Sequence, residues 1–160
     1  MKARSRLYLE TTIPSYLVAR PRNDLRLSAD QAATVDWWEN GRGSFEIFIS
    51  AVVLREIGRG EPEMAAKRQA IVEGLPILDL TNEAEMLAEK LLRDLLPKNA
   101  AEDAAHIAIA AAHSMDFLLT WNCRHINNRY TIRRIEKCCA EVGMTCPVIA
   151  TPAELMSIEP

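Results

Sequence analysis

The sequence has no hydrophobic run long enough to cross a membrane and no pattern of a secretory signal. Its 160 residues contain no stretch approaching the roughly 20 apolar residues that a membrane-spanning helix needs. The charged opening, Met1 to Arg6, leads into no apolar core of a signal peptide. We therefore expect a cytoplasmic protein that does not enter membranes.

An excess of positive charge is also missing, because 19 lysines and arginines stand against 22 aspartates and glutamates. Domains that bind nucleic acid by bulk charge usually carry a basic surface, so any nucleic-acid function must rest on local features. Two segments are locally basic: residues 1–26 hold six basic and two acidic residues, and residues 122–142 hold five and two. These segments are where we expect a phosphate backbone to approach.

The four cysteines lack the spacing of a metal site or a disulfide framework. Cys123, Cys138, Cys139 and Cys146 form no CxxC pair. Adjacent cysteines cannot easily form a disulfide or supply two ligands to one zinc ion, so we expect reduced, structural thiols. Internal repeats and low-complexity linkers are absent as well, and the length predicts a single domain over residues 1–160.

Short apolar segments alternate with segments of helical pattern along the chain. Strands are expected at residues 7–9, 45–49, 77–80, 117–120 and 147–150. Helices are expected from about 13, over 29–40 after a Ser28 cap, and over 50–58, 62–74, 81–96, 100–114, 131–142 and 152–155. This alternation predicts an α/β fold, a three-layer α/β/α sandwich with a mainly parallel central sheet.

Polar residues follow several of the expected strands, at the edge where parallel sheets bind ligands. Glu10 comes after the first strand, and Glu56 lies on the helix after the second. Asp103 stands near the start of the alanine-rich helix, and Asn122 follows the strand at 117–120. A cluster of oxygen ligands at one rim is the donor set that Mg²⁺ or Mn²⁺ prefers.

Each of these acids also has an ordinary explanation. Glu10 alone fits a solvated acid or an ion-pair partner, and Glu56 fits an exposed helix acid paired with Arg55 or Arg59. Asp103 fits an acid that complements the positive end of its helix. Their shared placement beyond the strands, rather than any one residue, favours the metal site.

The same positions carry a resemblance to a known family. Four segments look like the signature blocks of PIN-domain nucleases, and in particular of the VapC-like toxins of bacterial toxin–antitoxin pairs. The segments are Glu10-Thr11-Thr12-Ile13-Pro14-Ser15-Tyr16-Leu17, Ile49-Ser50 with Glu56, Glu102-Asp103-Ala104-Ala105-His106-Ile107-Ala108-Ile109-Ala110, and Leu118-Leu119-Thr120-Trp121-Asn122-Cys123-Arg124-His125-Ile126. The resemblance extends from Leu7 to about Leu155.

This resemblance implies hydrolysis of RNA phosphodiester bonds by a ribonuclease that depends on Mg²⁺ or Mn²⁺. It implies that Glu10, Glu56 and Asp103 hold the metal and that Asn122 occupies a fourth catalytic position. Two positions depart from the family pattern: Glu10 stands where an aspartate is usual, and Asn122 stands where a fourth acid is usual. Three carboxylates suffice for one ion, and whether a second ion binds stays open. A cognate antitoxin and a homodimer are the implied partners, beside the RNA substrate.

Five neighbouring residues are candidates for contact with substrate. Thr11, Thr12 and Thr120 are expected to hydrogen-bond either the acids or a phosphate group, with turn capping as the alternative. Arg124 and His125 follow the strand end directly and are candidates for phosphate contact, with surface ion pairing or packing as the alternative.

Other conspicuous side chains favour structural explanations. His106 lies three residues after Asp103 on the same side of its helix, and we expect a packed, hydrogen-bonded histidine rather than a catalytic one. Trp37 and Trp38 are expected in the core or in an interface, with partner contact as one use of that surface.

Two other functions remain open from the sequence. The first is a PIN-fold protein that holds RNA or a partner without cutting, because both departures weaken the metal site. The second is a metal-dependent hydrolase of a small phosphate ester. The basic segments favour the polymeric substrate over the small one.

Overall fold

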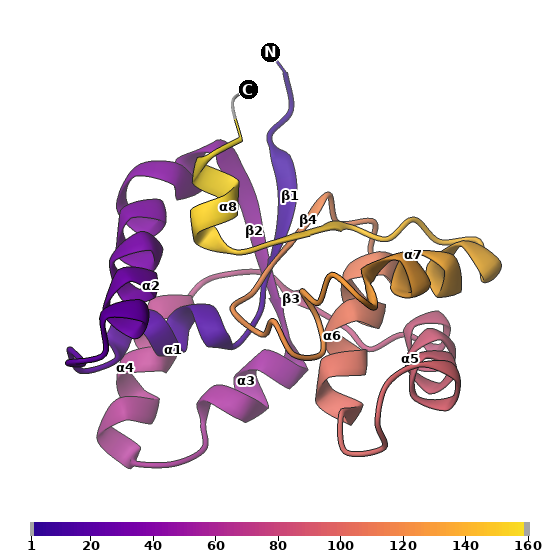
Figure 1. Ribbon diagram of the computed structural model, residues 1–160, viewed down its shortest axis with the longest axis horizontal. Coiled ribbons are helices and arrows are strands. Elements are labelled where there is room, and N and C mark those ends of the chain that lie inside the picture. Colours follow the sequence, from indigo (N-terminus) through magenta and orange to yellow (C-terminus); the bar gives the residue numbers. More distant parts are fainter. Residues whose placement is uncertain (1, 159–160) are drawn as a thin grey trace.

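The computed structural model describes residues 2–158, which form a parallel sheet with helices on both faces (Figure 1). The strands are β1 (Ser5–Leu9), β2 (Phe45–Ser50), β3 (Ile77–Leu78), β4 (Phe117–Leu119) and β5 (Val148–Ala150). Their order in the sheet is β3-β2-β1-β4-β5, and every neighbouring pair is parallel. The predicted α/β class with a mainly parallel central sheet is confirmed.

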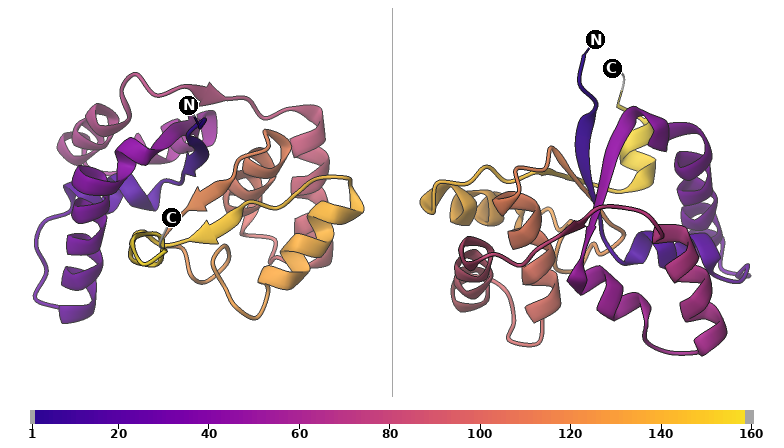
Figure 2. Two further views of the ribbon diagram at one scale, coloured as in Figure 1. Left: turned by 90° about the horizontal axis from the view of Figure 1, so that it is seen from above. Right: turned by 180° about the vertical axis from the view of Figure 1, so that it is seen from behind.

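The helices form the two outer layers. They are α1 (Thr12–Val18), α2 (Leu25–Asp36), α3 (Ala51–Ile57), α4 (Pro62–Val72), α5 (Asn82–Asp94), α6 (Ala101–Ala112), α7 (Ile132–Glu141) and α8 (Pro152–Met156). Helices α1, α2, α4 and α8 lie on one side of the sheet and α5, α6 and α7 on the other, as the front and back views agree (Figures 1 and 2). No helix within residues 2–158 is long and apolar enough to cross a membrane.

The strand order reverses between β1 and β4. From β1 the chain builds outward through β2 to β3, and it then returns to the other side of β1 for β4 and β5. Strand β1 is the middle strand, and Leu7, Tyr8 and Leu9 are fully buried there between the helical layers. Ligand sites of parallel sheets usually lie beyond the carboxyl ends of the strands at such a reversal. Glu10 and Thr120, which directly follow β1 and β4, stand at this position.

Helix α6 fits tightly because its residues are small. Every residue from Ala104 to Ala111 is buried, since the helix packs between the sheet and α5. Alanine has the highest helix propensity and lets neighbouring elements approach closely. The first turns of α6 are thereby fixed near the carboxyl end of the sheet, which places Asp103 and His106 beside the residues that follow β1 and β4.

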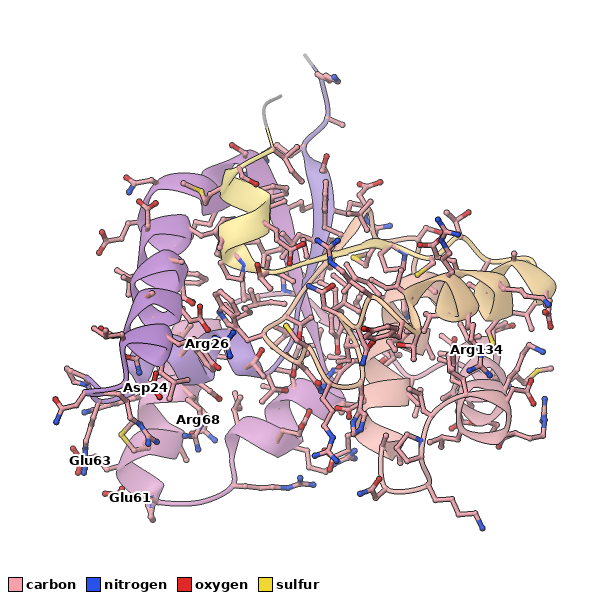
Figure 3. All side chains as sticks on the ribbon, in the orientation of Figure 1. Asp24, Arg26, Glu61, Glu63, Arg68 and Arg134 are labelled. Atoms are coloured by element: carbon pink, nitrogen blue, oxygen red, sulfur yellow. The ribbon has the colours of Figure 1, made fainter. Side chains whose placement is uncertain are left out.

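Helix α2 begins earlier than the sequence analysis predicted. The carboxylate of Asp24 accepts hydrogen bonds from the backbone N–H groups of Arg26 (2.9 Å) and Leu27 (3.2 Å), so Asp24 is the cap (Figure 3). The prediction of a Ser28 cap is wrong, because the aspartate offers an acceptor to the free N–H groups one turn earlier. The strand expected over 77–80 is also shorter, since only Ile77 and Leu78 pair with β2.

The end of α2 continues through a π-helical turn, Trp37–Gly41, and a short 3-10 turn into β2. Trp37 is fully buried in the core, whereas Trp38 is half-buried with the Arg42 guanidinium 4.1 Å above its ring. The core prediction for Trp37 is confirmed, and its burial removes it from any partner surface. Gly41 is required in this turn, because a Cβ there would lie 2.7 Å from Cδ1 of Trp37. All four cysteines are free thiols, as expected.

Candidate metal centre

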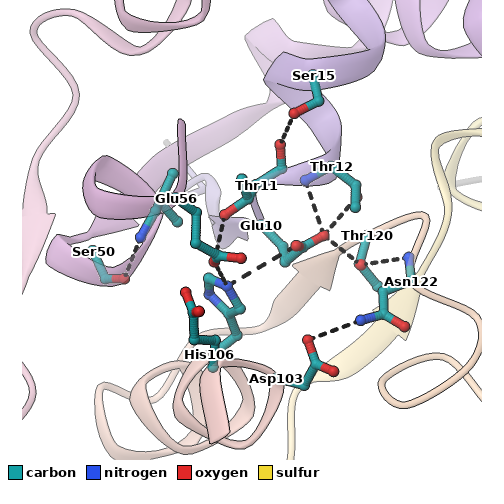
Figure 4. Close-up of polar contacts among 12 residues, drawn as sticks. Glu10, Thr11, Thr12, Ser15, Ser50, Glu56, Asp103, His106, Thr120 and Asn122 are labelled. Atoms are coloured by element: carbon teal, nitrogen blue, oxygen red, sulfur yellow. Dashed lines mark hydrogen bonds and ion pairs between the residues drawn. The ribbon is translucent and has the colours of Figure 1, made fainter. Parts of the chain in front are cut away.

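Side chains from four parts of the chain meet beyond β1 and β4 (Figure 4). Glu10 follows β1, Glu56 projects from α3, and Asn122 follows β4. Asp103 and His106 come from adjacent turns of α6. The sequence analysis placed Glu10, Glu56, Asp103 and Asn122 at one rim, and the structure brings these four side chains into one network of polar contacts.

Glu10 is almost fully buried, with 3% of its surface exposed, and it is held by three donors. Its Oε1 accepts hydrogen bonds from the backbone N–H of Thr12 (3.1 Å), the Thr12 hydroxyl (2.5 Å) and the Thr120 hydroxyl (2.6 Å). Hydrogen bonds to a carboxylate are stronger than those between neutral groups, so they offset part of the cost of burying the charge. Oε2 is the other oxygen, and it lies 4.0 Å from Nε2 of His106.

The hydroxyl groups of Thr12 and Thr120 are fixed in direction by their other partners. The Thr12 oxygen accepts a hydrogen bond from the backbone N–H of Trp121 (2.8 Å), and the Thr120 oxygen accepts one from the N–H of Asn122 (2.9 Å). A hydroxyl has one hydrogen to donate, and in both residues it points to Glu10. Of the roles that the sequence left open, this arrangement supports orientation of the acid rather than contact with phosphate.

Glu56 and His106 form the second half of the cluster. Oε1 of Glu56 accepts a hydrogen bond from the Thr11 hydroxyl (2.9 Å) and also contacts Nε2 of His106. The imidazole is fully buried, and its Nδ1 lies 2.6 Å from the hydroxyl oxygen of Tyr8, which in turn lies 2.7 Å from Oγ of Ser50. The prediction of a packed, hydrogen-bonded histidine is confirmed, and its partner is one of the candidate metal-binding acids.

The charges of this pair support one another. Burial by itself raises the pKa of Glu56, but the hydrogen bonds from His106 and Thr11 outweigh it, and the pKa of that carboxyl is lowered. Burial likewise lowers the pKa of His106, but the bond to Glu56 and the nearby charges of Glu10 and Asp103 outweigh it, and the pKa of the imidazole is raised. The two pKa values are thus shifted in opposite directions by the same contact between carboxylate and imidazole.

Asp103 is held at a more open position by Asn122 and His125. Its Oδ1 accepts a hydrogen bond from Nδ2 of Asn122 (3.0 Å), and its Oδ2 lies 2.7 Å from Nδ1 of His125. The side chains of Asp103 and His125 are each 21% exposed. Oδ1 of Asn122 accepts the backbone N–H of His125 (3.0 Å), so both ends of the amide are engaged. Asn122 thus orients Asp103, and the structure puts His125 on that carboxylate.

Three ligand atoms of this network lie close enough to share one cation. They belong to Glu10, Glu56 and His106 and all fall within 4.8 Å of one another, while Asp103 stands outside this group. Two carboxylates in a buried setting fit a divalent cation. The sequence analysis did not place His106 among the ligands, although its spacing of three from Asp103 put it on the correct side of the helix.

An aromatic pair borders the same rim. The rings of Tyr16 and Trp121 stack with centroids 5.6 Å apart and planes 10° from parallel. The Trp121 indole N–H donates a hydrogen bond to Oγ1 of Thr34 on α2 (2.8 Å). Arg124 is exposed on the turn that follows. The indole therefore connects the loop after β4 to the helical layer that contains α2.

Comparison with known proteins supports the fold. No family model and no curated protein matches the sequence. A solved structure does match: a chain in the crystal structure of VapBC2 from Rickettsia felis bound to a DNA fragment from their promoter. The match has a TM-score of 0.53 and 18% sequence identity, and it covers 91% of this chain and 97% of the other. The chain thus shares the fold of that chain, in agreement with the PIN-like fold that its sequence blocks predicted.

Proposed function

We propose that this protein is a metal-dependent endoribonuclease. The observation that carries the proposal is the convergence of Glu10, Glu56 and Asp103 at the reversal point of a PIN-like sheet, with Glu10 and Glu56 held by threonine hydroxyls. Acids oriented by donors from the protein are what a divalent cation requires of its ligands, because ligating carboxylates are usually hydrogen-bonded by a second layer of residues.

Glu10, Glu56 and Asp103 would hold Mg²⁺ or Mn²⁺. When bound there, such an ion supplies Lewis acidity toward a water molecule and toward the oxygens of the scissile phosphate. Glu56 is the acid suited to accept the proton of the attacking water, since its carboxylate is 21% exposed whereas that of Glu10 is 4% exposed. Asp103 is equally exposed, but its two oxygens are engaged by Asn122 and His125. Asn122 keeps Asp103 in position through the amide hydrogen bond of 3.0 Å.

Arg124 and His125 are proposed to contact the RNA backbone. Arg124 is exposed on the turn after β4, and it belongs to the basic segment of residues 122–142. His125 uses Nδ1 toward Asp103, so Nε2 is the ring nitrogen that can meet a phosphate oxygen. Local positive charge beside a cation site allows a mildly acidic protein to approach a polyanion.

We further propose that the protein works as the toxin of a type II pair, with a cognate antitoxin, and that it forms a homodimer. The structurally similar chain belongs to VapBC2, which was solved bound to DNA from "their" promoter, and this membership of a pair supports a protein partner for this chain. Light scattering tests the homodimer, because the chain mass is 17.9 kDa and a dimer has twice that mass.

Cleavage of defined RNAs by purified protein, with and without Mn²⁺, tests the activity. We expect cleavage that requires the metal and is lost in Glu10→Gln and Asp103→Asn. The matched control is Glu102→Gln, which removes the adjacent negative charge on α6 from a side chain that pairs with Arg59 (2.8 Å) instead of joining the centre.

Equal cleavage by the wild type and both centre variants would identify a contaminating nuclease and refute the proposal. Hydrolysis of a small phosphate ester without cleavage of RNA would assign the centre to a different substrate.

A further inference from the structure

His106 is placed as a ligand rather than as a neighbour of the acids. Its side chain is fully buried, and Nε2 contacts the Glu56 carboxylate and lies 4.0 Å from Oε2 of Glu10. Metal–ligand bonds to imidazole nitrogen and carboxylate oxygen are about 2.0–2.2 Å long, so donors that share an ion lie within about 4.4 Å of one another. The three ligand atoms lie within 4.8 Å of one another, slightly more than this limit, and Glu56 is the partly exposed member of the group, whose small shift would close the difference.

The far side of the imidazole has the support that metal-binding histidines usually have. Nδ1 lies 2.6 Å from the hydroxyl oxygen of Tyr8, and that oxygen lies 2.7 Å from Oγ of Ser50. Tyr8 is fully buried on the middle strand and Ser50 is fully buried at the end of β2. When Nδ1–H donates to Tyr8 and the Tyr8 hydroxyl donates to Ser50, the lone pair of Nε2 faces the acids. A partner of this kind fixes both the tautomer and the ring orientation of a ligating histidine.

We propose that His106 Nε2 is a direct ligand of the metal ion, together with Glu10 and Glu56. This inference rests on the proposed function, because that function requires a metal ion among these acids. Asp103, which Asn122 and His125 hold at the open side, then completes the rim from outside this trio.

The donor set decides which ions the centre prefers. Mg²⁺ favours oxygen ligands and gives up its waters reluctantly, so an imidazole ligand disfavours it. Mn²⁺ also binds carboxylates, but it belongs to the first-row transition ions, which accept nitrogen ligands as well. A trio of two carboxylates and one imidazole therefore binds Mn²⁺ more tightly than Mg²⁺. An all-carboxylate centre lacks this source of discrimination.

Electron paramagnetic resonance of Mn²⁺ added to the metal-free protein tests the inference. We expect one tightly bound ion whose pulsed spectrum contains the coupling of a directly bound ¹⁴N nucleus, replaced by ¹⁵N coupling when histidine is labelled. His106→Gln should lose this coupling and weaken Mn²⁺ binding by at least the roughly 10- to 100-fold that loss of a supporting residue costs. His125→Gln is the matched control and should keep the coupling, because its ring contacts Asp103 instead of the trio.

Competition with Mg²⁺ gives a second readout. A large excess of Mg²⁺ should leave Mn²⁺ bound in the wild type and displace it in His106→Gln. Tyr8→Phe keeps the imidazole and removes its support, so it should weaken Mn²⁺ binding while the nitrogen coupling persists. If His106→Gln does not fold, the ¹⁵N-labelled wild type and Tyr8→Phe still decide the question.

The outcomes separate the two proposals. Bound Mn²⁺ without nitrogen coupling, in a protein that cleaves RNA only with Mn²⁺, overturns the ligand role of His106 and leaves the nuclease intact. Nitrogen coupling in a protein that cleaves no RNA overturns the nuclease and leaves the ligand role of His106 intact. A wild type that binds no Mn²⁺ overturns both.

Discussion

Replacement of Thr120 by valine should destabilise the protein more than the same replacement at another buried threonine. Thr120 is fully buried, and its hydroxyl donates to the Glu10 carboxylate (2.6 Å) and accepts the N–H of Asn122 (2.9 Å). Valine has nearly the same shape, so the change removes both hydrogen bonds without opening a cavity. The perturbation therefore isolates the support that this hydroxyl gives to the buried charge.

The magnitude follows from the charge of the lost partner. A hydrogen bond to a charged group contributes about 1.5–3 kcal/mol, and a neutral one about 1 kcal/mol. Thr34 is equally buried, but its hydroxyl donates to the Asp30 carbonyl (2.6 Å) and accepts the Trp121 indole N–H (2.8 Å), which are neutral partners. The destabilisation by Thr120→Val should exceed that by Thr34→Val by about 0.5–2 kcal/mol. For a domain of this size, that difference lowers the melting temperature by about 1–8 °C more.

Urea and thermal unfolding in metal-free buffer measure both variants against the wild type. A double-mutant cycle with Glu10→Gln then gives the coupling energy between Thr120 and Glu10. Thr120→Val should cost less in the Glu10→Gln background, because the hydroxyl there faces a neutral amide. Equal losses for Thr120→Val and Thr34→Val, with no coupling between Thr120 and Glu10, would refute the claim that this hydroxyl stabilises a buried negative charge.

Three further predictions concern the scaffold. Gly41→Ala places a Cβ 2.7 Å from an indole carbon and should cost about 1–3 kcal/mol in urea unfolding, whereas Gly43→Ala enters open space and should cost less. Asp24→Ala should lower the free energy of unfolding by about 1 kcal/mol, because a helix cap is lost, and Ser28→Ala should not. A larger loss for Ser28→Ala than for Asp24→Ala would show that Ser28 is the cap. Burial raises the pKa of Tyr8, so its stabilising contribution is complete below the ordinary tyrosine pKa of about 10 and falls as pH rises above it. Absorbance at alkaline pH should show one tyrosine that ionises only as the protein unfolds, and this step should be missing in Tyr8→Phe. Ionisation of all tyrosines in the folded protein would contradict the assignment.

The sequence predicted the sheet and the acids because both leave strong local patterns. Apolar segments such as residues 7–9 can be buried on both faces only in the middle of a covered parallel sheet, and that sheet places the following residue at its carboxyl edge. Glu10, Glu56, Asp103 and Asn122 could therefore be grouped before the chain was folded. The PIN-like resemblance supplied the same residues from motifs.

The contacts inside the centre could not be predicted from the sequence. Whether Thr12 and Thr120 face an acid or a phosphate depends on side-chain directions that spacing does not encode, and the same holds for the amide of Asn122. His106 was predicted to be a core residue because it lies in a run of alanine and isoleucine, and its side chain is buried. Its second role became visible only when α3 brought Glu56 against its Nε2.

The two halves of the centre differ in how firmly they are anchored. Glu10 is attached to the neighbouring strand by its own N–H, which donates to the carbonyl of Leu119 (3.1 Å), so it moves only with the central sheet. Glu56 lies on α3, which packs through Val52, Val53 and Ile57, and Asp103 lies on α6, which packs through buried alanines such as Ala108. One acid of the centre is thus positioned by the sheet itself and the other two by the packing of helices against it. The spacing of the acids can be retuned by the size of a residue that never touches metal or RNA.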